Sequence, residues 1–166
     1  MIALHEFNHL PHEKAIALIH PCVALPGWAD ALAQGRPYAS REELFSTAKA
    51  LTQAWGEAAL TQALSAHPRI GEKPAGSQGE AALSRQEQAA VNEGDADLAR
   101  ALREGNARYE ARFGRVFLIR AKGRSGEDIL QALHARLENS DAQEARAALE
   151  QLREITLLRL EGVISE

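Results

Sequence analysis

The stretch DAQEARAALEQLREITLLRLEGV, residues 141–163, carries the helical pattern that decides the fold class of this chain. At roughly 100° per residue, one face of this stretch collects Ala145, Ala148, Leu149, Leu152, Ile155, Thr156 and Val163. Such a stripe predicts a helix that begins at about Asp141 and buries one side against other parts of the fold.

Arg159 falls near the middle of that apolar face. A buried guanidinium needs an anion, because an unpaired charge in the interior is unfavourable. A carboxylate of the fold could supply the anion, or the side chain could extend its charge to solvent at the helix end. The position could also open into a pocket that receives an anionic ligand. The sequence leaves these interpretations open.

Helical signals also dominate the rest of the chain. The expected helices cover residues 11–19, 27–33, 40–55, 57–65, 84–112 and 125–138, the fifth with a break near Gly94. Residues 71–83 are rich in Gly, Pro and Ser and predict a surface loop. VFLI, residues 116–119, predicts a buried extended connector or a lone strand. We therefore expect an all-α, single-domain multi-helix bundle over residues 1–166, with one short extended connector.

Composition and charge narrow the class of partner. With 45% hydrophobic residues in a chain of 166, one core is enough for the whole length. The net charge of -4 offers no positive field, so we expect neither nucleic acid nor a membrane as partner. Cys22 is alone and the N-terminus lacks a basic signal-peptide region, which favours a cytoplasmic protein. A small-molecule substrate fits better, and the apolar helix faces could support a homodimer.

Metal and nucleophile motifs are absent from the sequence. His12, His20 and His134 form no H-x-x-x-H or H-E-x-x-H pair, so we expect no metal site. The sequence contains neither the G-x-S-x-G motif of serine hydrolases nor the P-loop of nucleotide-binding proteins. These two functions therefore lack the residues that they require.

His67 is the first candidate for chemistry. It follows an expected helix and precedes Pro68, which restricts its backbone to extended angles and so gives the ring a reproducible direction. Imidazole exchanges a proton near neutral pH without much tuning. The alternative is that the His-Pro pair simply ends a helix, with the ring in solvent.

Glu87 has two interpretations. Ser84-Arg85-Gln86-Glu87 has the capping-box form, which predicts that Ser84 begins a helix and that Glu87 caps it. Glu87 also lies one turn before Val91, at the edge of the apolar stripe of that expected helix. An inward carboxylate could orient an imidazolium and raise its pKa.

Four segments in this order resemble a known family. They are HPRIGE at 67–72, SRQEQ at 84–88, NARYEARFGRVFLI at 106–119 and REITLLRLEGVI at 153–164. Together they are similar to the 2-oxo-4-hydroxy-4-carboxy-5-ureidoimidazoline (OHCU) decarboxylases of urate breakdown, over almost the whole chain. The resemblance implies an all-helical carboxy-lyase that makes (S)-allantoin and carbon dioxide without a metal or an organic cofactor.

The resemblance also implies a site. His67 would be the catalytic acid. Our own interpretation of the residues adds that Glu87 fixes the orientation of its ring. The substrate contacts would come from Pro68, Ser84, Arg85, Gln86, Glu87, Gln88, Ile119, Arg120, Ala121, Lys122, Gly123 and Arg159. Two alternatives stay open at this stage: a non-catalytic helical interaction module and a hydrolase acting on allantoin or a related ureide.

Overall fold

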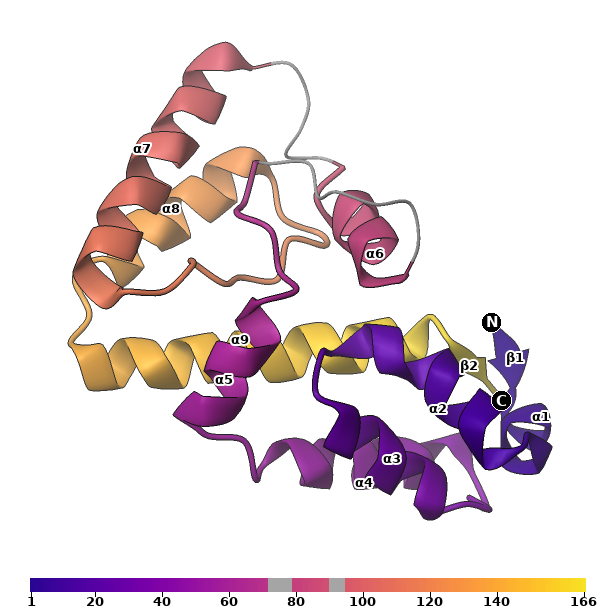
Figure 1. Cartoon of the computed structure of the whole chain (residues 1–166). Helices are drawn as coiled ribbons and strands as arrows, with labels where there is room; N and C mark the ends of the chain where they lie inside the picture. The colour runs from indigo at the N-terminus through magenta and orange to yellow at the C-terminus, as the bar shows by residue number, and fades with distance from the viewer. Residues whose placement is uncertain (72–78, 90–94) are drawn as a thin grey trace. The chain divides into compact units, whose positions relative to one another are not determined.

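The computed structural model describes residues 1–71, 79–89 and 95–166, and these are mostly helical (Figure 1). The elements are β1 (Ile2–Ala3), α1 (Leu4–His9), α2 (His12–Ile19), the 3-10 turn η1 (His20–Cys22), α3 (Pro26–Gln34), α4 (Arg41–Thr52), α5 (Glu57–Leu64), α6 (Gly79–Glu87), α7 (Ala96–Phe113), α8 (Gly126–Arg136), α9 (Asp141–Glu161) and β2 (Ile164–Ser165). The all-α prediction is confirmed. Within the described ranges, no helix combines the length and the apolar character that crossing a membrane requires.

The chain packs as two compact units. Unit 1 comprises residues Met1–Ala63 and Arg153–Glu166, and unit 2 comprises residues Leu64–Leu152. The boundary falls within α9, so this helix contributes residues to both units. That residues 1–166 act as a single domain stays a prediction.

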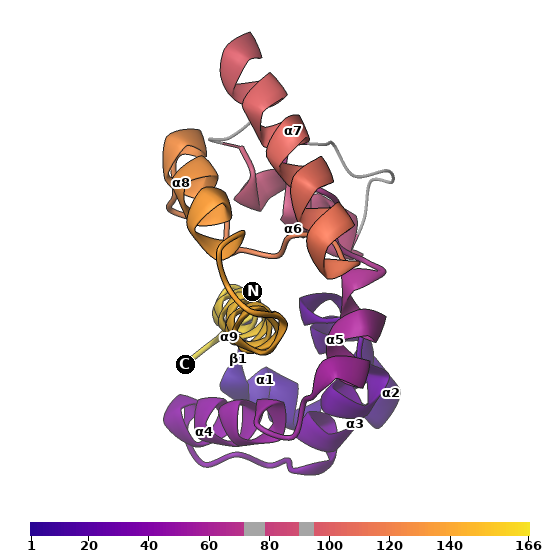
Figure 2. The same ribbon diagram turned by 90° about the vertical axis from the view of Figure 1, so that its left-hand side faces the viewer.

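In unit 1, α3 packs against both α2 and α4 (Figure 2). The start of α4 follows the sequence prediction, because Ser40 Oγ accepts a hydrogen bond from Glu43 N at 3.1 Å. Glu43 Oε2 accepts from Ala39 N at 2.7 Å, which satisfies a second amide before the first turn. The fully buried apolar side chains of this unit include Phe7, Ile19, Leu32, Leu44 and Leu60.

Unit 1 also contains a small parallel sheet that the sequence did not predict. β1 pairs with β2, with Ile2 opposite Ile164 and Ala3 opposite Ser165 (Figure 1). Each strand has two residues, which is too short for the alternation by which a strand is recognised. The pairing therefore depends on contacts between the two ends of the chain.

The core of unit 2 lies between α7, α8 and the segment that connects them. Its buried members are Ile70, Leu102, Tyr109, Phe117, Ile119, Ala121, Ile129, Leu133 and Leu137. Gly114 ends α7 with φ 72°, a backbone angle that glycine adopts readily. After it, Phe117, Leu118 and Ile119 are buried and belong to neither a helix nor a strand, as predicted for a buried connector.

The predicted helix start at Ser84 is wrong. Ser84 lies inside α6, which ends at Glu87, and the separate helix α7 begins after Asp95. The side chain of Asp95 accepts from Asp97 N at 3.0 Å and from Leu98 N at 3.1 Å, and so it is the true cap. The Ser-x-x-Glu spacing also occurs within helices, and the helix-forming residues before Ser84 extend α6 back to Gly79.

The expected loop at 71–83 is thereby corrected in part, since residues 79–83 are helical. Its residues 72–78 lie outside the described residues, as do Val91 and Gly94. The helix expected to reach residue 55 ends at Thr52 instead. The helix expected from residue 125 begins with a capping box, since Ser125 Oγ accepts from Asp128 N and Asp128 Oδ2 accepts from Ser125 N.

Candidate active site

His67 lies in unit 2, in the three-residue exit from α5. Its backbone N–H donates to Leu64 O at 3.1 Å, which continues the last turn of the helix. His67 and Pro68 are both half-buried. Because Pro68 fixes its own φ and restricts the backbone of His67, the imidazole is mounted on a short and stiff segment.

The three residues after Pro68 are held by α6 and α7. Asn106 Nδ2 donates to Ile70 O at 3.0 Å, and Gly71 N donates to Gln88 Oε1 at 3.0 Å. Arg69 forms a bidentate ion pair with Glu110, in which Arg69 Nε donates to Oε2 at 2.8 Å and Nη2 donates to Oε1 at 3.0 Å. The structure therefore brings together two segments that the sequence singled out, 67–71 and 84–88.

The predicted residues of α6, together with Gln88 directly after its end, divide between a buried and a more exposed side. Ser84 and Gln88 are 2% and 4% exposed, and they lie one turn apart on the buried side. Arg85 and Glu87 are half-buried, and Gln86 is exposed. Glu87 is the last residue of α6 and not the third. It therefore cannot be the N-terminal cap that the sequence offered as an alternative to a catalytic role.

The third predicted segment, residues 119–123, also belongs to unit 2. Ile119 and Ala121 are buried in the same core cluster as Ile70. Between them, the backbone N–H of Arg120 donates to Gln151 Oε1 at 2.8 Å, which ties the connector to α9. Lys122 and Gly123 are exposed and form a turn, where Gly123 has φ 82°.

A buried polar network contacts the connector at Phe117 and Leu118. Glu144 Oε1 accepts from the hydroxyl of Tyr109 at 2.5 Å and from Arg136 Nε at 2.8 Å. Arg136 Nη1 donates to Leu118 O at 2.6 Å, and its guanidinium lies 4.5 Å from the centre of the Phe117 ring. Burial raises the pKa of Tyr109 well above its usual range, and the hydrogen bond to Glu144 raises it further. The network joins α7, α8 and α9 at the start of the connector.

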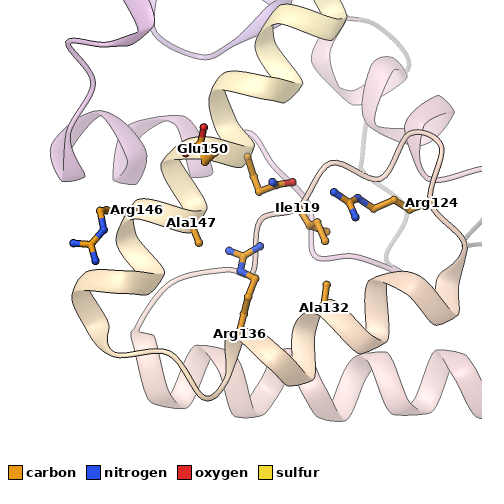
Figure 3. A pocket seen from close by; sticks show the side chains of 8 residues that line it. Ile119, Arg124, Ala132, Arg136, Arg146, Ala147 and Glu150 are labelled. Atoms are coloured by element: carbon orange, nitrogen blue, oxygen red, sulfur yellow. The ribbon is translucent and has the colours of Figure 1, made fainter.

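A cavity of about 420 Å³ opens beside this network (Figure 3). It is lined by Ile119, Arg124, Ala132, Arg136, Arg146, Ala147, Glu150 and Gln151. In Figure 3, Arg136 projects from α8 toward α9, and Arg146 projects outward. The cavity shares only Ile119 with the predicted substrate contacts.

Arg159 belongs to unit 1. It is 4% exposed, and its Nη1 donates to Pro21 O and Cys22 O at 3.5 and 3.4 Å. The side chain is thus buried as the helical projection predicted. That Arg159 shares a substrate pocket with His67 stays a prediction.

The other histidines, the cysteine and Trp28 have structural or surface positions. His12, His20 and His134 are exposed, and Cys22 is a buried thiol. Trp28 is a core residue whose ring nitrogen donates to Ala48 O at 3.2 Å. In residues 1–71, 79–89 and 95–166, no three His, Cys, Asp or Glu side chains gather as metal ligands would.

Three residues whose side chains hold these segments by hydrogen bonds were not predicted from the sequence: Asn106, Glu144 and Gln151. For Asn106 a signal exists, because it lies between Leu102 and Tyr109 on the apolar stripe of α7 and is itself 3% exposed. A polar residue on such a stripe indicates a specific buried hydrogen bond. Gln151 and Glu144 carry no comparable local signal.

Comparison with known proteins gives consistent matches across both units. The family model described as OHCU decarboxylase matches residues 8–161. A 2-oxo-4-hydroxy-4-carboxy-5-ureidoimidazoline decarboxylase of Amia calva is 31% identical, over 97% of this chain and 94% of that protein. A decarboxylase of the same name from Haloferax volcanii is 26% identical, over 96% and 94%. A crystal structure of OHCU decarboxylase in the presence of (S)-allantoin superimposes with a TM-score of 0.72 at 27% identity, over 86% of this chain and 94% of that one.

Proposed function

This chain belongs to the OHCU decarboxylase family, and we propose from that premise that it converts 2-oxo-4-hydroxy-4-carboxy-5-ureidoimidazoline to (S)-allantoin and carbon dioxide in urate breakdown. The observation that carries the proposal is the family match over residues 8–161, which includes every predicted site residue. The hydrogen bond from Gly71 to Gln88 supports it, because it joins the His67 segment to the Ser84–Gln88 segment.

The chemistry needs a proton donor and a rigid site. The bond between the ring carbon and the carboxylate breaks, carbon dioxide leaves, and the electron pair passes into the conjugated imidazoline. A proton is then added to one face of the ring carbon that becomes the stereocentre. Because the substrate supplies its own electron sink, we expect no metal or organic cofactor.

His67 gives this proton, and Glu87 orients and charges the imidazole. A carboxylate beside an imidazolium favours the protonated form, which keeps the donor loaded. Two observations support these roles: His67 lies on a stiff His-Pro exit from α5, and Glu87 has no capping function at the end of α6. Gln88 and backbone groups of residues 119–123 hold the ureido and ring atoms, and Arg159 holds the negative charge.

The cellular setting of the enzyme is part of the proposal. A lone buried Cys22 and a net charge of -4 support a cytoplasmic enzyme that binds neither nucleic acid nor a membrane. We keep a homodimer as a proposal that rests on the sequence.

The test generates the unstable ureidoimidazoline from urate in the cuvette and follows the circular dichroism of the allantoin formed. Spontaneous decay yields racemic allantoin, so a chiral signal that grows with protein concentration is the expected result. Release of urea or ammonia would indicate a ureide hydrolase instead. A racemic product at every protein concentration would refute the decarboxylase activity and favour an interaction module.

A further inference from the structure

Two residues of α7, one helical turn apart, hold the segment that follows His67. Asn106 donates to the carbonyl of Ile70 at 3.0 Å, and Glu110 binds the guanidinium of Arg69 through both carboxylate oxygens. The ion pair is partly exposed, with 48% of the Arg69 side chain and 26% of the Glu110 side chain accessible. Asn106 is 3% exposed and is therefore the buried contact of the two.

The amide of Asn106 is poorly explained as a stabilising group. Its Oδ1 is buried, and within the part of the chain that the structure describes this oxygen has no hydrogen-bond partner. An unsatisfied buried acceptor costs about as much as the hydrogen bond made by the other end of the amide contributes. An apolar residue of the same shape would suit the neighbouring Leu102 and Tyr109 better. What Asn106 provides is a fixed position for the Ile70 carbonyl.

The position of the Ile70 carbonyl affects His67 because residues 67–70 have few accessible backbone conformations. On one side, the His67 N–H is bound to Leu64 O. On the other side, Pro68 has a fixed φ, and Ile70 is anchored both by its carbonyl and by its buried side chain. A shift of the Ile70 carbonyl therefore turns the His-Pro unit and changes the direction of the ring.

We propose that Asn106 is a positioning residue that aims the imidazole of His67 at one face of the substrate ring. This inference rests on the proposed function, in which His67 is the proton donor. A donor that is displaced by a fraction of an ångström transfers its proton more slowly and with less preference for one face. The loss of Asn106 thus lowers kcat and the handedness of the allantoin together, with little change in KM.

The experiment compares Asn106→Leu with Asn8→Leu and His67→Gln. Asn8 is the matched control, because its amide also donates to a backbone carbonyl, that of Tyr38 at 2.9 Å, but in unit 1 and away from the predicted site residues. Turnover is measured per folded protein, with folding checked by thermal unfolding. The enantiomeric excess of allantoin is measured at enzyme concentrations high enough to outpace spontaneous decay.

For Asn106→Leu we expect kcat to fall about 10- to 100-fold, with a clear drop in enantiomeric excess. Asn8→Leu keeps the kcat and the enantiomeric excess of the parent protein. If Asn106→Leu does not fold, Asn106→Ala removes the same donor without adding an apolar contact and gives the same readout. Unchanged kcat, or a lower kcat with full enantiomeric excess, overturns the positioning role.

The two proposals fail in different ways. If His67→Gln is inactive and Asn106→Leu equals the parent protein, only the inference about Asn106 is refuted. If His67→Gln keeps its turnover, His67 is not the donor, and the role of Asn106 falls with it. If no variant, including the parent protein, makes chiral allantoin, the decarboxylase proposal itself is refuted.

Discussion

Gln88 accepts a hydrogen bond from the backbone amide of Gly71 at 3.0 Å, and this contact fastens the end of α6 to the segment that carries His67. Gln88 is 4% exposed, so its side chain acts as a structural link between the two segments whatever else it touches. Oε1 of Gln88 accepts the hydrogen bond from Gly71. The proposed contact with the substrate therefore depends on the amide nitrogen of Gln88.

Substitutions of Gln88 separate these two roles. Gln88→Met removes the acceptor, and we expect the free energy of unfolding to fall by about 1–3 kcal/mol, with reduced turnover. Gln88→Glu keeps an acceptor for Gly71 but loses the amide donor, so stability should change less while KM rises. Exposed Gln131 supplies the control Gln131→Met, which should alter neither. Equal KM in Gln88→Glu and the parent protein would remove Gln88 from the substrate contacts.

His67→Gln should abolish most of the proposed activity without unfolding the protein. His67 is half-buried and its backbone bond to Leu64 does not need the ring, so the fold should survive. General acids of this type contribute about 10²- to 10⁴-fold in rate, and we expect a loss of that order in steady-state assays. Turnover within a few-fold of the parent protein would exclude His67 as the donor.

Glu87→Gln tests whether the carboxylate serves the histidine. Because Glu87 ends α6, it has no N-cap amide to satisfy, and stability should change little. The loss of negative charge lowers the pKa of a neighbouring imidazole. The pH at which kcat declines should therefore move downward relative to the parent protein. Glu104→Gln, at an exposed position of α7, is the control. An unchanged pH profile of kcat would indicate that Glu87 does not act on His67.

Glu144→Gln should strongly destabilise unit 2. The Glu144 and Arg136 side chains are 1% and 11% exposed, and the change leaves the guanidinium of Arg136 buried without its countercharge. Breaking a buried pair in this way costs about 3–5 kcal/mol. Denaturant unfolding should show that loss, whereas exposed Glu138→Gln should change stability by less than about 0.5 kcal/mol. A similar small effect for both variants would show that the network contributes little.

Both tyrosines of the chain should ionise at a higher pH in the folded protein than an ordinary tyrosine does. Burial raises the pKa of Tyr109 and of Tyr38, with further increases from the charges of Glu144 and Glu43 respectively. A raised folded pKa means that the stabilisation is complete below the ordinary value of 10.0 and is lost as the pH rises through the folded value.

The free energy of unfolding should therefore decrease above about pH 10, as measured by denaturant titrations at increasing pH. Tyr109→Phe should make this alkaline decrease shallower, because Phe has no proton to lose. Ultraviolet absorbance of tyrosinate gives the second readout. Ionisation of both tyrosines at their ordinary pKa in the folded protein would contradict the prediction.

Helices could be predicted wherever the signal is local. The caps at Ser40 and Ser125 and the glycine stop at Gly114 act within one turn of the chain, so a short window of residues contains the whole cause. The same local rule failed at Ser84, because nothing in four residues distinguishes a helix start from the middle of a helix. In the structure, one helix begins at Gly79, before Ser84, and the next helix begins after the cap at Asp95.

The family resemblance proposes which residues form the site, while the hydrogen bonds that hold their segments are visible only in the fold. Gln88 with Gly71, Asn106 with Ile70 and Gln151 with Arg120 are pairs distant along the chain. None of them follows a helical or strand period. Their partners are backbone groups, which every residue carries, so the sequence gives no hint of which one is chosen.

The sequence by itself determined that the chain is helical, where most helices begin and end, and which family it belongs to. These properties follow from periodicity, capping chemistry and motif order, all of which are local or linear. Only the tertiary structure decided that α7 holds the segment behind His67, that Glu144 joins three helices, and that β1 pairs with β2. Such contacts depend on which buried polar groups meet when the apolar faces pack, because each group must find its partner in the space that packing leaves.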